Sequence, residues 1–131
     1  TVATFQSESG ESLDAFATRI AKPAIKFTIK HGVEVCGMLA QREQTYAIIL
    51  TTSGMNAECH IRKSAIPVGF TSMEKTYHTH PGLVHARFLD GDYAMAGYLA
   101  TWFGLKYQEG RGTERHVKRF DFYRENLLSN L

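Results

Sequence analysis

Apolar residues recur every three or four positions near the N-terminus of the chain, and this spacing predicts an amphipathic helix over residues 12–21. Its apolar face consists of Leu13, Phe16, Ala17 and Ile20. Proline lacks the amide hydrogen that a helix interior needs, so Pro23 is expected to break or restart the helix. Residues 1–10 are polar, and we expect them to be loosely ordered.

Alternating and short apolar runs in the rest of the chain predict strands. We expect them over residues 34–40, 46–50, 59–65 and 74–80, with a final hairpin over residues 105–108 and 117–123. Asp90 and Asp92 are good capping residues, and the apolar pattern after them predicts a second helix over residues 91–102 that ends at Gly104. A last helical turn is expected over residues 125–131. These elements indicate a single α/β domain, residues 1–131, in which helices flank a mixed sheet.

The composition supports one globular domain. The chain has 131 residues, of which 44% are hydrophobic and 21% charged, and a chain of this length buries roughly two-thirds of its unfolded surface. No run of 18 apolar residues is present, so we expect no membrane-spanning segment, and the N-terminus shows no secretory signal. The formal charge of +2 is too small to indicate a nucleic-acid partner.

Basic residues concentrate in one C-terminal stretch of the chain. They are Arg111, Arg115, Lys118, Arg119 and Arg124. We interpret this stretch as an edge strand protected by its charge. The alternative is a surface that binds anions or nucleic acid through the first four of these residues, with an affinity that falls steeply with salt.

The two cysteines of the chain, Cys36 and Cys59, are too few for a disulfide framework. We expect them to be small buried side chains in a reducing compartment. A single bridge between them stays open as the alternative.

The sharpest chemical signal is the sequence His78-Thr79-His80-Pro81. Residues two apart on a strand point to the same side, so both imidazoles can bind one metal ion. Asp92 is expected at the start of a helix, where backbone amides orient its carboxylate. Two histidines and one aspartate leave a fourth position for water, as in catalytic zinc sites.

Catalysis by water at such a site also needs a base, and Glu34 is the candidate. It begins an otherwise apolar segment, and a carboxylate is costly to bury without a partner. A water on the metal would supply that partner. The competing interpretation is that Glu34 is an ordinary residue at the start of a strand.

Three segments taken together resemble the pattern of the JAMM (JAB1/MPN/Mov34) metallopeptidases. They are Glu34-Val-Cys-Gly-Met-Leu, Tyr77-His-Thr-His-Pro and Phe88-Leu-Asp-Gly-Asp92. In that family a glutamate precedes a glycine-containing strand, His-Ser/Thr-His-Pro follows, and Ser-x-x-Asp opens a helix. The resemblance covers residues 12–108 and leaves a basic C-terminal extension, 109–131, unexplained. It is nearest to a bacterial branch of unknown function found at the ends of RHS-type toxins.

The resemblance implies an MPN/cytidine-deaminase-like domain that acts as a zinc-dependent peptidase or isopeptidase. His78, His80 and Asp92 would bind zinc, and Glu34 would hold and deprotonate the water that attacks an amide or isopeptide carbonyl. The substrate would be a protein or peptide, and a toxin domain of this kind would have an immunity protein as partner. Such a domain would act in the cytoplasm or be delivered or secreted as part of a larger toxin.

The chain departs from the family pattern at Leu89, which stands where the family has its serine. Leucine donates no hydrogen bond, and the loss of one oxyanion donor costs about 10²–10³ in rate. Thr79, Arg87 or a backbone amide would have to substitute. The spacing after the histidines is one residue longer than usual, which makes Asp90 a rival of Asp92 as third ligand. The alternative function is a non-catalytic MPN-like module that binds a protein partner.

Overall fold

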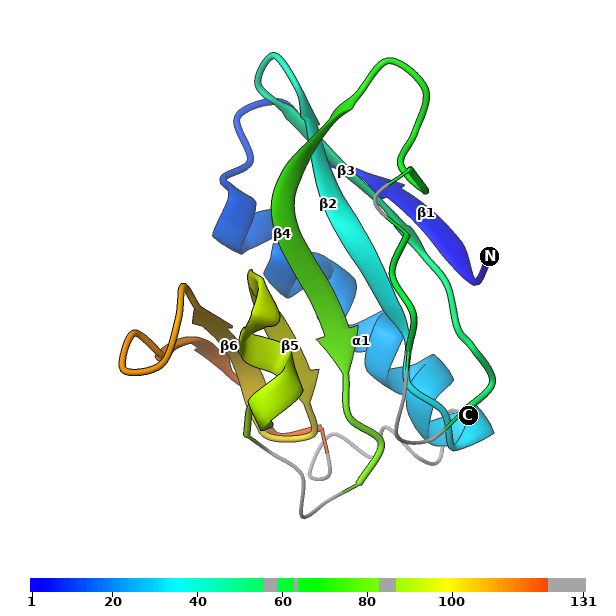
Figure 1. Ribbon diagram of the computed structural model, residues 1–131, viewed down its shortest axis with the longest axis vertical. Coiled ribbons are helices and arrows are strands. Elements are labelled where there is room, and N and C mark those ends of the chain that lie inside the picture. The colour runs from blue at the N-terminus through cyan, green and yellow to red at the C-terminus, as the bar shows by residue number, and fades with distance from the viewer. Residues whose placement is uncertain (56–58, 63, 83–86, 123–131) are drawn as a thin grey trace.

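A seven-stranded mixed sheet forms the centre of the structure, a computed structural model described over residues 1–55, 59–62, 64–82 and 87–122 (Figure 1). The strands are β1 (Ala3–Gln6), β2 (Cys36–Arg42), β3 (Thr45–Leu50), β4 (Thr71–Thr79), β5 (Ala96–Thr101), β6 (Gly104–Gln108) and β7 (Arg115–Arg119). Their order across the sheet is β1-β3-β2-β4-β5-β6-β7. Neighbouring strands are antiparallel except β4 and β5, which run parallel.

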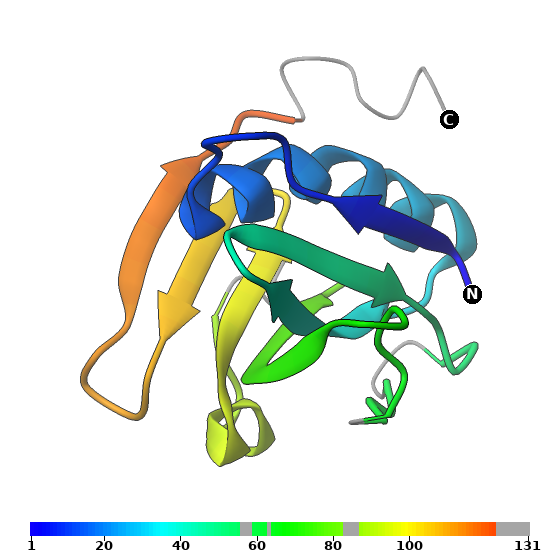
Figure 2. The same cartoon turned by 90° about the horizontal axis from the view of Figure 1, so that it is seen from above.

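The helix α1 (Leu13–His31) packs along one face of the sheet (Figure 2). Ser12 caps its start, where the hydroxyl oxygen accepts a hydrogen bond of 3.1 Å from the amide of Ala15. Gly32 ends the helix in the left-handed conformation (φ 65°), and its amide donates to the carbonyl of Thr28 at 2.8 Å. Among the described helices, none has the length and hydropathy that crossing a bilayer requires.

α1 continues through Pro23, so the predicted break at that residue is wrong. A proline in a helix interior removes one hydrogen bond and costs about 3 kcal/mol relative to alanine. Pro23 itself is exposed, whereas Ile20, Ala24 and Ile25 on either side of it are buried. Burial of this apolar face offsets the local cost, since each fully buried isoleucine contributes roughly 1.5–3 kcal/mol.

The core lies between α1 and the sheet. Its large, fully buried side chains are Phe16, Ile20, Ile25, Leu39, Ile48, Tyr77, Tyr98 and Leu105. The hydroxyl of Tyr77 donates to the carbonyl of Ala17 at 2.8 Å, and that of Tyr98 donates to Oδ1 of Asp14 at 2.5 Å. The polar ends of both tyrosines are therefore satisfied on α1, which fixes the helix against β4 and β5.

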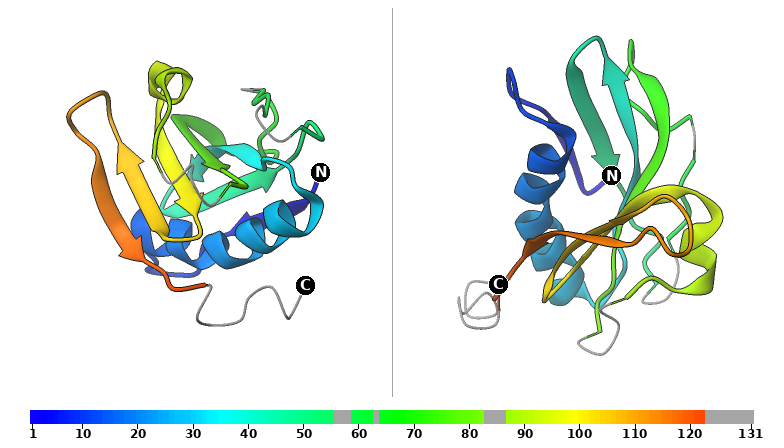
Figure 3. Two further views of the ribbon diagram at one scale, coloured as in Figure 1. Left: turned by 90° about the horizontal axis from the view of Figure 1, so that it is seen from below. Right: turned by 90° about the vertical axis from the view of Figure 1, so that its left-hand side faces the viewer.

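The connection between β4 and β5 crosses the opposite face of the sheet. Parallel strands cannot be joined by a tight hairpin, so this connection is long, and part of it forms a short 3₁₀-helix, η1 (Asp90–Ala94). Figure 3 shows α1 and η1 on opposite sides of the sheet. The end of β4 and η1 are thereby brought together on the face that α1 leaves open.

The second helix predicted over residues 91–102 is wrong. Only Asp90–Ala94 is helical, and Ala96–Thr101 is strand β5. From Gly97 onward β5 is buried on both faces, and the apolar run of such a strand cannot be told from a helix by periodicity. Gly97 also packs closely on β4, where a Cβ would lie 2.3 Å from Oγ1 of Thr76.

Two other expectations from the sequence fail. The described residues of the segment 59–65 form no strand, and the segment is joined to β2 through the disulfide of Cys59. Residues 1–10 are not loosely ordered throughout, since they include β1, which pairs with β3 at the edge of the sheet. The turn predicted over residues 125–131 lies outside the described residues.

The α/β class and the mixed sheet are confirmed. β2, β3 and β4 lie close to the predicted strands 34–40, 46–50 and 74–80, and β6 with β7 forms the predicted hairpin. In the described part of the chain a single α-helix covers the sheet, where the sequence predicts helices on its flanks. β7 lies at an edge of the sheet with four of its five residues exposed, as expected for a strand protected by charge.

Candidate metal centre

The end of β4 and the residue that follows it place two imidazoles, of His78 and His80, on the face of the sheet opposite α1. Tyr77 and Thr79 point toward the helix, where the hydroxyl of Thr79 is hydrogen-bonded to that of Thr28. Because side chains alternate along a strand, His78 and His80 point the other way. Their ring centroids are 4.9 Å apart, and the residues are 8% and 3% exposed.

Asp92 of η1 completes the cluster. Its Oδ1 lies 3.1 Å from Nε2 of His78, and its Oδ2 lies 3.5 Å from Nε2 of His80. The amide of Leu89 donates to Oδ2 at 2.7 Å, and the buried side chain of Gln108 donates to the Asp92 carbonyl at 3.1 Å. Both the carboxylate and the backbone of Asp92 are thus held in place, so the structure brings the three predicted ligands together.

The spacing of these donor atoms suits one small metal ion. One ligand atom from each of the three residues lies within 4.8 Å of the others. Ligands at about 2.0–2.1 Å from a tetrahedral ion lie roughly 3.4 Å apart. The contacts of 3.1 and 3.5 Å are of similar length, and each involves a different oxygen of Asp92. The cluster can therefore hold a metal ion.

A buried nitrogen and the charge of Asp92 support the same interpretation. Nε2 of His78 is buried and faces Oδ1 of Asp92 at 3.1 Å without a well-formed hydrogen bond to a described residue. A metal ion held between the two atoms would satisfy both. Burial raises the pKa of Asp92, but the two histidines and the Leu89 amide outweigh this effect. The pKa of Asp92 is held well below its usual range, so the cluster combines two nitrogen donors with an anionic oxygen donor.

Asp90, the rival third ligand, points away from the cluster. Its side chain is 96% exposed, and its Oδ1 accepts a hydrogen bond of 2.7 Å from Nη2 of Arg111. Arg115 likewise pairs with Asp14, at 3.0 Å. Two of the four cations considered for an anion site are therefore already paired with carboxylates.

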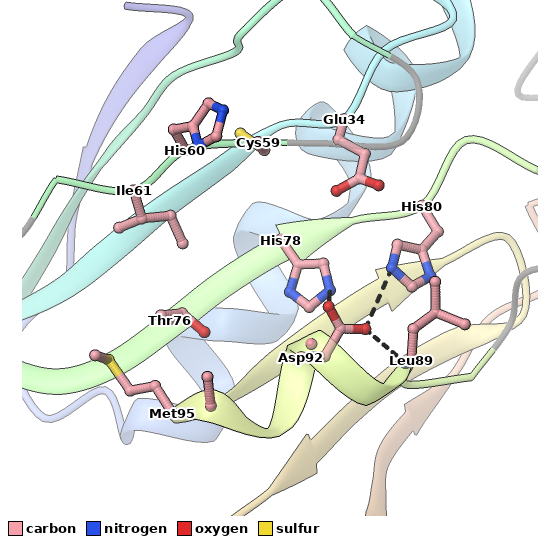
Figure 4. A pocket seen from close by; sticks show the side chains of 12 residues that line it. Glu34, Cys59, His60, Ile61, Thr76, His78, His80, Leu89, Asp92 and Met95 are labelled. Atoms are coloured by element: carbon pink, nitrogen blue, oxygen red, sulfur yellow. Dashed lines mark hydrogen bonds and ion pairs between the residues drawn. The ribbon is translucent and has the colours of Figure 1, made fainter.

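Glu34 lies next to the three candidate metal ligands, just before β2. Only 8% of the residue is exposed, and Figure 4 shows its carboxylate directed into a cavity toward His78 and His80. Its amide donates to the carbonyl of Met55 at 2.8 Å, and its carbonyl accepts from the hydroxyl of Thr52 at 2.7 Å. These backbone contacts hold the position of Glu34, which is where the sequence predicts a base.

The cavity that Glu34 and the cluster share has a volume of about 380 Å³ (Figure 4). One wall consists of Cys59, His60 and Ile61, from the segment after β3, and the other consists of η1 and its flanking residues Leu89 and Met95. The cavity is therefore bounded by two connections that lie far apart in the sequence.

Leu89 stands where the JAMM pattern has a serine, and neither of the two side chains considered as substitutes, Thr79 and Arg87, lines the cavity. Leu89 lines the cavity and is 46% exposed, but its amide already donates to Asp92. Thr79 is fully buried on the α1 side, where its hydroxyl accepts from the amide of Val35 at 3.0 Å. Arg87 is exposed and does not line the cavity. A backbone amide is the remaining candidate of those considered.

Cys36 and Cys59 form a disulfide, with Cα atoms 6.0 Å apart, so the expectation of two reduced thiols is wrong. Cys36 begins β2 as the neighbour of His78 on β4, and Cys59 belongs to the cavity wall. Sequence reasoning missed this wall altogether. The one available signal was Cys36 itself, two residues after the predicted base, because a bridge at that position must bring its partner to the site.

Comparison of the chain with models of protein families, with curated protein sequences and with solved structures finds no match. The interpretation of the site rests on its residues and their geometry.

Proposed function

We propose that the protein is a zinc-dependent peptidase or isopeptidase of the JAMM type, built on an MPN/cytidine-deaminase-like domain. The observation that carries the proposal is the convergence of His78, His80 and Asp92 beside the nearly buried carboxylate of Glu34. A metal site with a carboxylate directed at it, but outside the ligand set, is the arrangement that hydrolysis by an activated water requires.

The chain's own residues would divide the work as follows. His78, His80 and Asp92 would hold zinc, which lowers the pKa of a coordinated water and polarises the carbonyl of the substrate. Glu34 accepts a proton from the attacking water and returns it to the amine that leaves.

The substrate class is a protein or peptide with an exposed amide or isopeptide bond. The Cys36–Cys59 disulfide supports a chain that spends time in an oxidising compartment, as a delivered or secreted toxin domain would. An immunity protein covering the cavity is the partner that such a domain would have.

A second candidate function is a non-catalytic module that binds a protein partner through the same fold. Leu89 favours it, because this residue gives no oxyanion donor where the family has a serine. Cleavage of a substrate would distinguish the two functions, whereas metal binding would not.

The test combines metal analysis of the purified chain with digestion of a synthetic peptide mixture that includes lysine-linked isopeptides. We expect about one zinc per chain, lost in His78→Ala and kept in the control His116→Ala, whose residue is exposed on β7. Glu34→Gln should keep zinc and lose turnover, whereas Glu8→Gln, which changes an exposed glutamate, should keep both.

Three results would argue against the enzyme. A folded chain without zinc at neutral pH would remove the metal site, and loss of zinc in Glu34→Gln would show that Glu34 is not the base. A zinc-loaded chain that cleaves nothing in the mixture would favour the binding module. Leu89→Ser should raise activity or leave it level if the missing donor limits the rate.

A further inference from the structure

The cavity beside the three candidate metal ligands has two chemically different ends. Glu34, His78, His80 and Asp92 gather at one end. The other end extends along β4 over Thr76, with Ile61 on one side of the strand and Met95 on the other (Figure 4). The charged groups that line the cavity therefore lie together, and the region over Thr76 is bounded mainly by apolar side chains.

From this arrangement we infer that Ile61 and Met95 form a subsite for one apolar side chain of the substrate, next to the bond that is cleaved. The inference rests on the proposed function, since it takes the metal cluster as the reacting centre. The occupant is an extended peptide that lies along β4 and carries a leucine- or methionine-sized residue over Thr76. The inference thereby extends the proposed function to one substrate class, peptides with a large apolar side chain next to the cleaved bond.

Both walls of the subsite are fixed before any peptide binds. Ile61 follows Cys59, which the disulfide ties to β2, and the amide of His60 donates to the hydroxyl of Ser53 at 3.1 Å. The carbonyl of Met95 accepts a hydrogen bond of 2.7 Å from the buried side chain of Gln108. A preformed site loses little entropy on binding, so its contacts contribute to specificity.

The apolar walls of this end argue against acidic occupants. An aspartate over Thr76 would lose hydration against Ile61 and Met95, and neither of these side chains offers it a hydrogen bond or a positive charge in return. A leucine would instead remove apolar surface from water on both sides.

The expected preference follows from the area that such a side chain buries. Full burial of a leucine-sized side chain corresponds to roughly 10- to 100-fold in affinity. The Ile61–Met95 subsite should therefore favour leucine over glycine by up to this factor and reject aspartate.

The test is a titration followed by NMR, with capped pentapeptides Gly-Gly-X-Gly-Gly in which X is leucine, methionine, glycine, aspartate or lysine. The zinc-loaded Glu34→Gln variant is used so that no peptide is consumed. We expect the leucine and methionine peptides to bind at least 10-fold more tightly than the aspartate peptide. The chemical shifts of Ile61, Thr76 and Met95 should move together during the titration.

Variants of both walls then locate the preference. Ile61→Asp and Met95→Asp, each made in the Glu34→Gln chain, should abolish the leucine preference while zinc content and fold are kept. Val68→Asp is the matched control, because Val68 lies in the same connection between β3 and β4 as Ile61 and is 97% exposed. It should leave the preference intact.

The outcomes separate this inference from the proposed function. Equal affinities for the leucine and aspartate peptides, or a preference that both wall variants keep, would overturn the subsite even if the wild-type chain cleaves peptides. A leucine preference that depends on Ile61 and Met95, in a chain that cleaves nothing, would keep the subsite and overturn the peptidase. Should one variant fail to fold, the other still decides.

Discussion

Reduction of the Cys36–Cys59 disulfide should lower the free energy of unfolding by an amount that depends on the number of residues between the two cysteines. The two cysteines are 23 positions apart. Closing a loop of this length removes about 3.4 kcal/mol of conformational entropy from the unfolded chain at 25 °C, by the chain-entropy relation. With an unfolding entropy of about 2.1 cal/mol/K per residue over the chain, this corresponds to a fall in Tm of roughly 12 °C.

The effect should act mainly on the unfolded state. β3 lies between the two cysteines, and it is held in the folded sheet by β1 and β2 without the bridge. Cys36 and Thr51 also exchange two backbone hydrogen bonds, of 2.9 and 2.8 Å. The reduced protein should therefore keep its fold and the proposed zinc, because the three candidate ligands lie at the end of β4 and on η1.

The assay is urea unfolding followed by circular dichroism, with and without a phosphine reductant. The double variant Cys36→Ala with Cys59→Ala is the control and should not respond to the reductant. A loss below about 1 kcal/mol in the wild-type protein would refute the reasoning, since the bridge would then not restrict the unfolded chain. Two free thiols in the oxidised, denatured protein would refute it directly.

The reduced protein should also bind leucine peptides less well. The bridge is the covalent tie between β2 and the wall that carries Ile61. We expect the NMR titration of reduced, zinc-loaded protein to show a smaller difference between the leucine and aspartate peptides. An unchanged difference would mean that backbone hydrogen bonds alone hold this wall.

Three further predictions concern the fold. Gly97→Ala should cost about 1–3 kcal/mol in urea unfolding, because the new Cβ would lie 2.3 Å from a side-chain oxygen of β4, whereas at Gly91 a Cβ meets nothing within 4 Å and alanine should be tolerated. Pro23→Ala should raise stability, by about 2 kcal/mol, since Pro23 is exposed inside α1; a loss would show that the proline ring packs favourably. Burial raises the pKa of Asp14, but hydrogen bonds from Arg115 and Tyr98 lower it by more, so the pKa in the folded protein is below its usual value. Its contribution to stability is thus present above the unfolded pKa and is lost as pH falls through the lower folded pKa, so Asp14→Asn should flatten the loss of stability below about pH 4.

Local pattern was sufficient for α1 and for the strands whose short apolar runs are bounded by polar residues or turns. α1 begins at its serine cap with the predicted apolar face buried, and β2, β3 and the final hairpin lie close to the predicted ranges. α1 buries one face, so its helical period survives in the sequence. β2 is buried on both faces from Cys36 to Ala40, and it was recognised because the polar residues 41–44 bound its short apolar run. β5 is buried on both sides, and there the pattern carries no period and was mistaken for a helix.

The site also has features that local sequence predicts and features that it does not. His78 and His80 share a face because they are two apart on one strand, and this relation is local and readable from the sequence. The choice between Asp90 and Asp92 is not local, because it depends on how η1 turns over the sheet. Arg111 holds Asp90 at the surface, while the Leu89 amide and Gln108 hold Asp92 at the histidines.

By itself, then, the sequence determined the α/β class and the paired imidazoles, since these follow from residue type and from spacing within elements. It also indicated Glu34 as the candidate base, from the cost of burying a carboxylate in an apolar segment. The tertiary structure decided between Asp92, the predicted third candidate ligand, and its rival Asp90, and it alone showed the disulfide and the Ile61–Met95 walls of the cavity. Each of these depends on where the parallel crossover from β4 to β5 and the connection after β3 lie over the sheet. Such placement follows from packing between distant segments, which spacing along the chain does not encode.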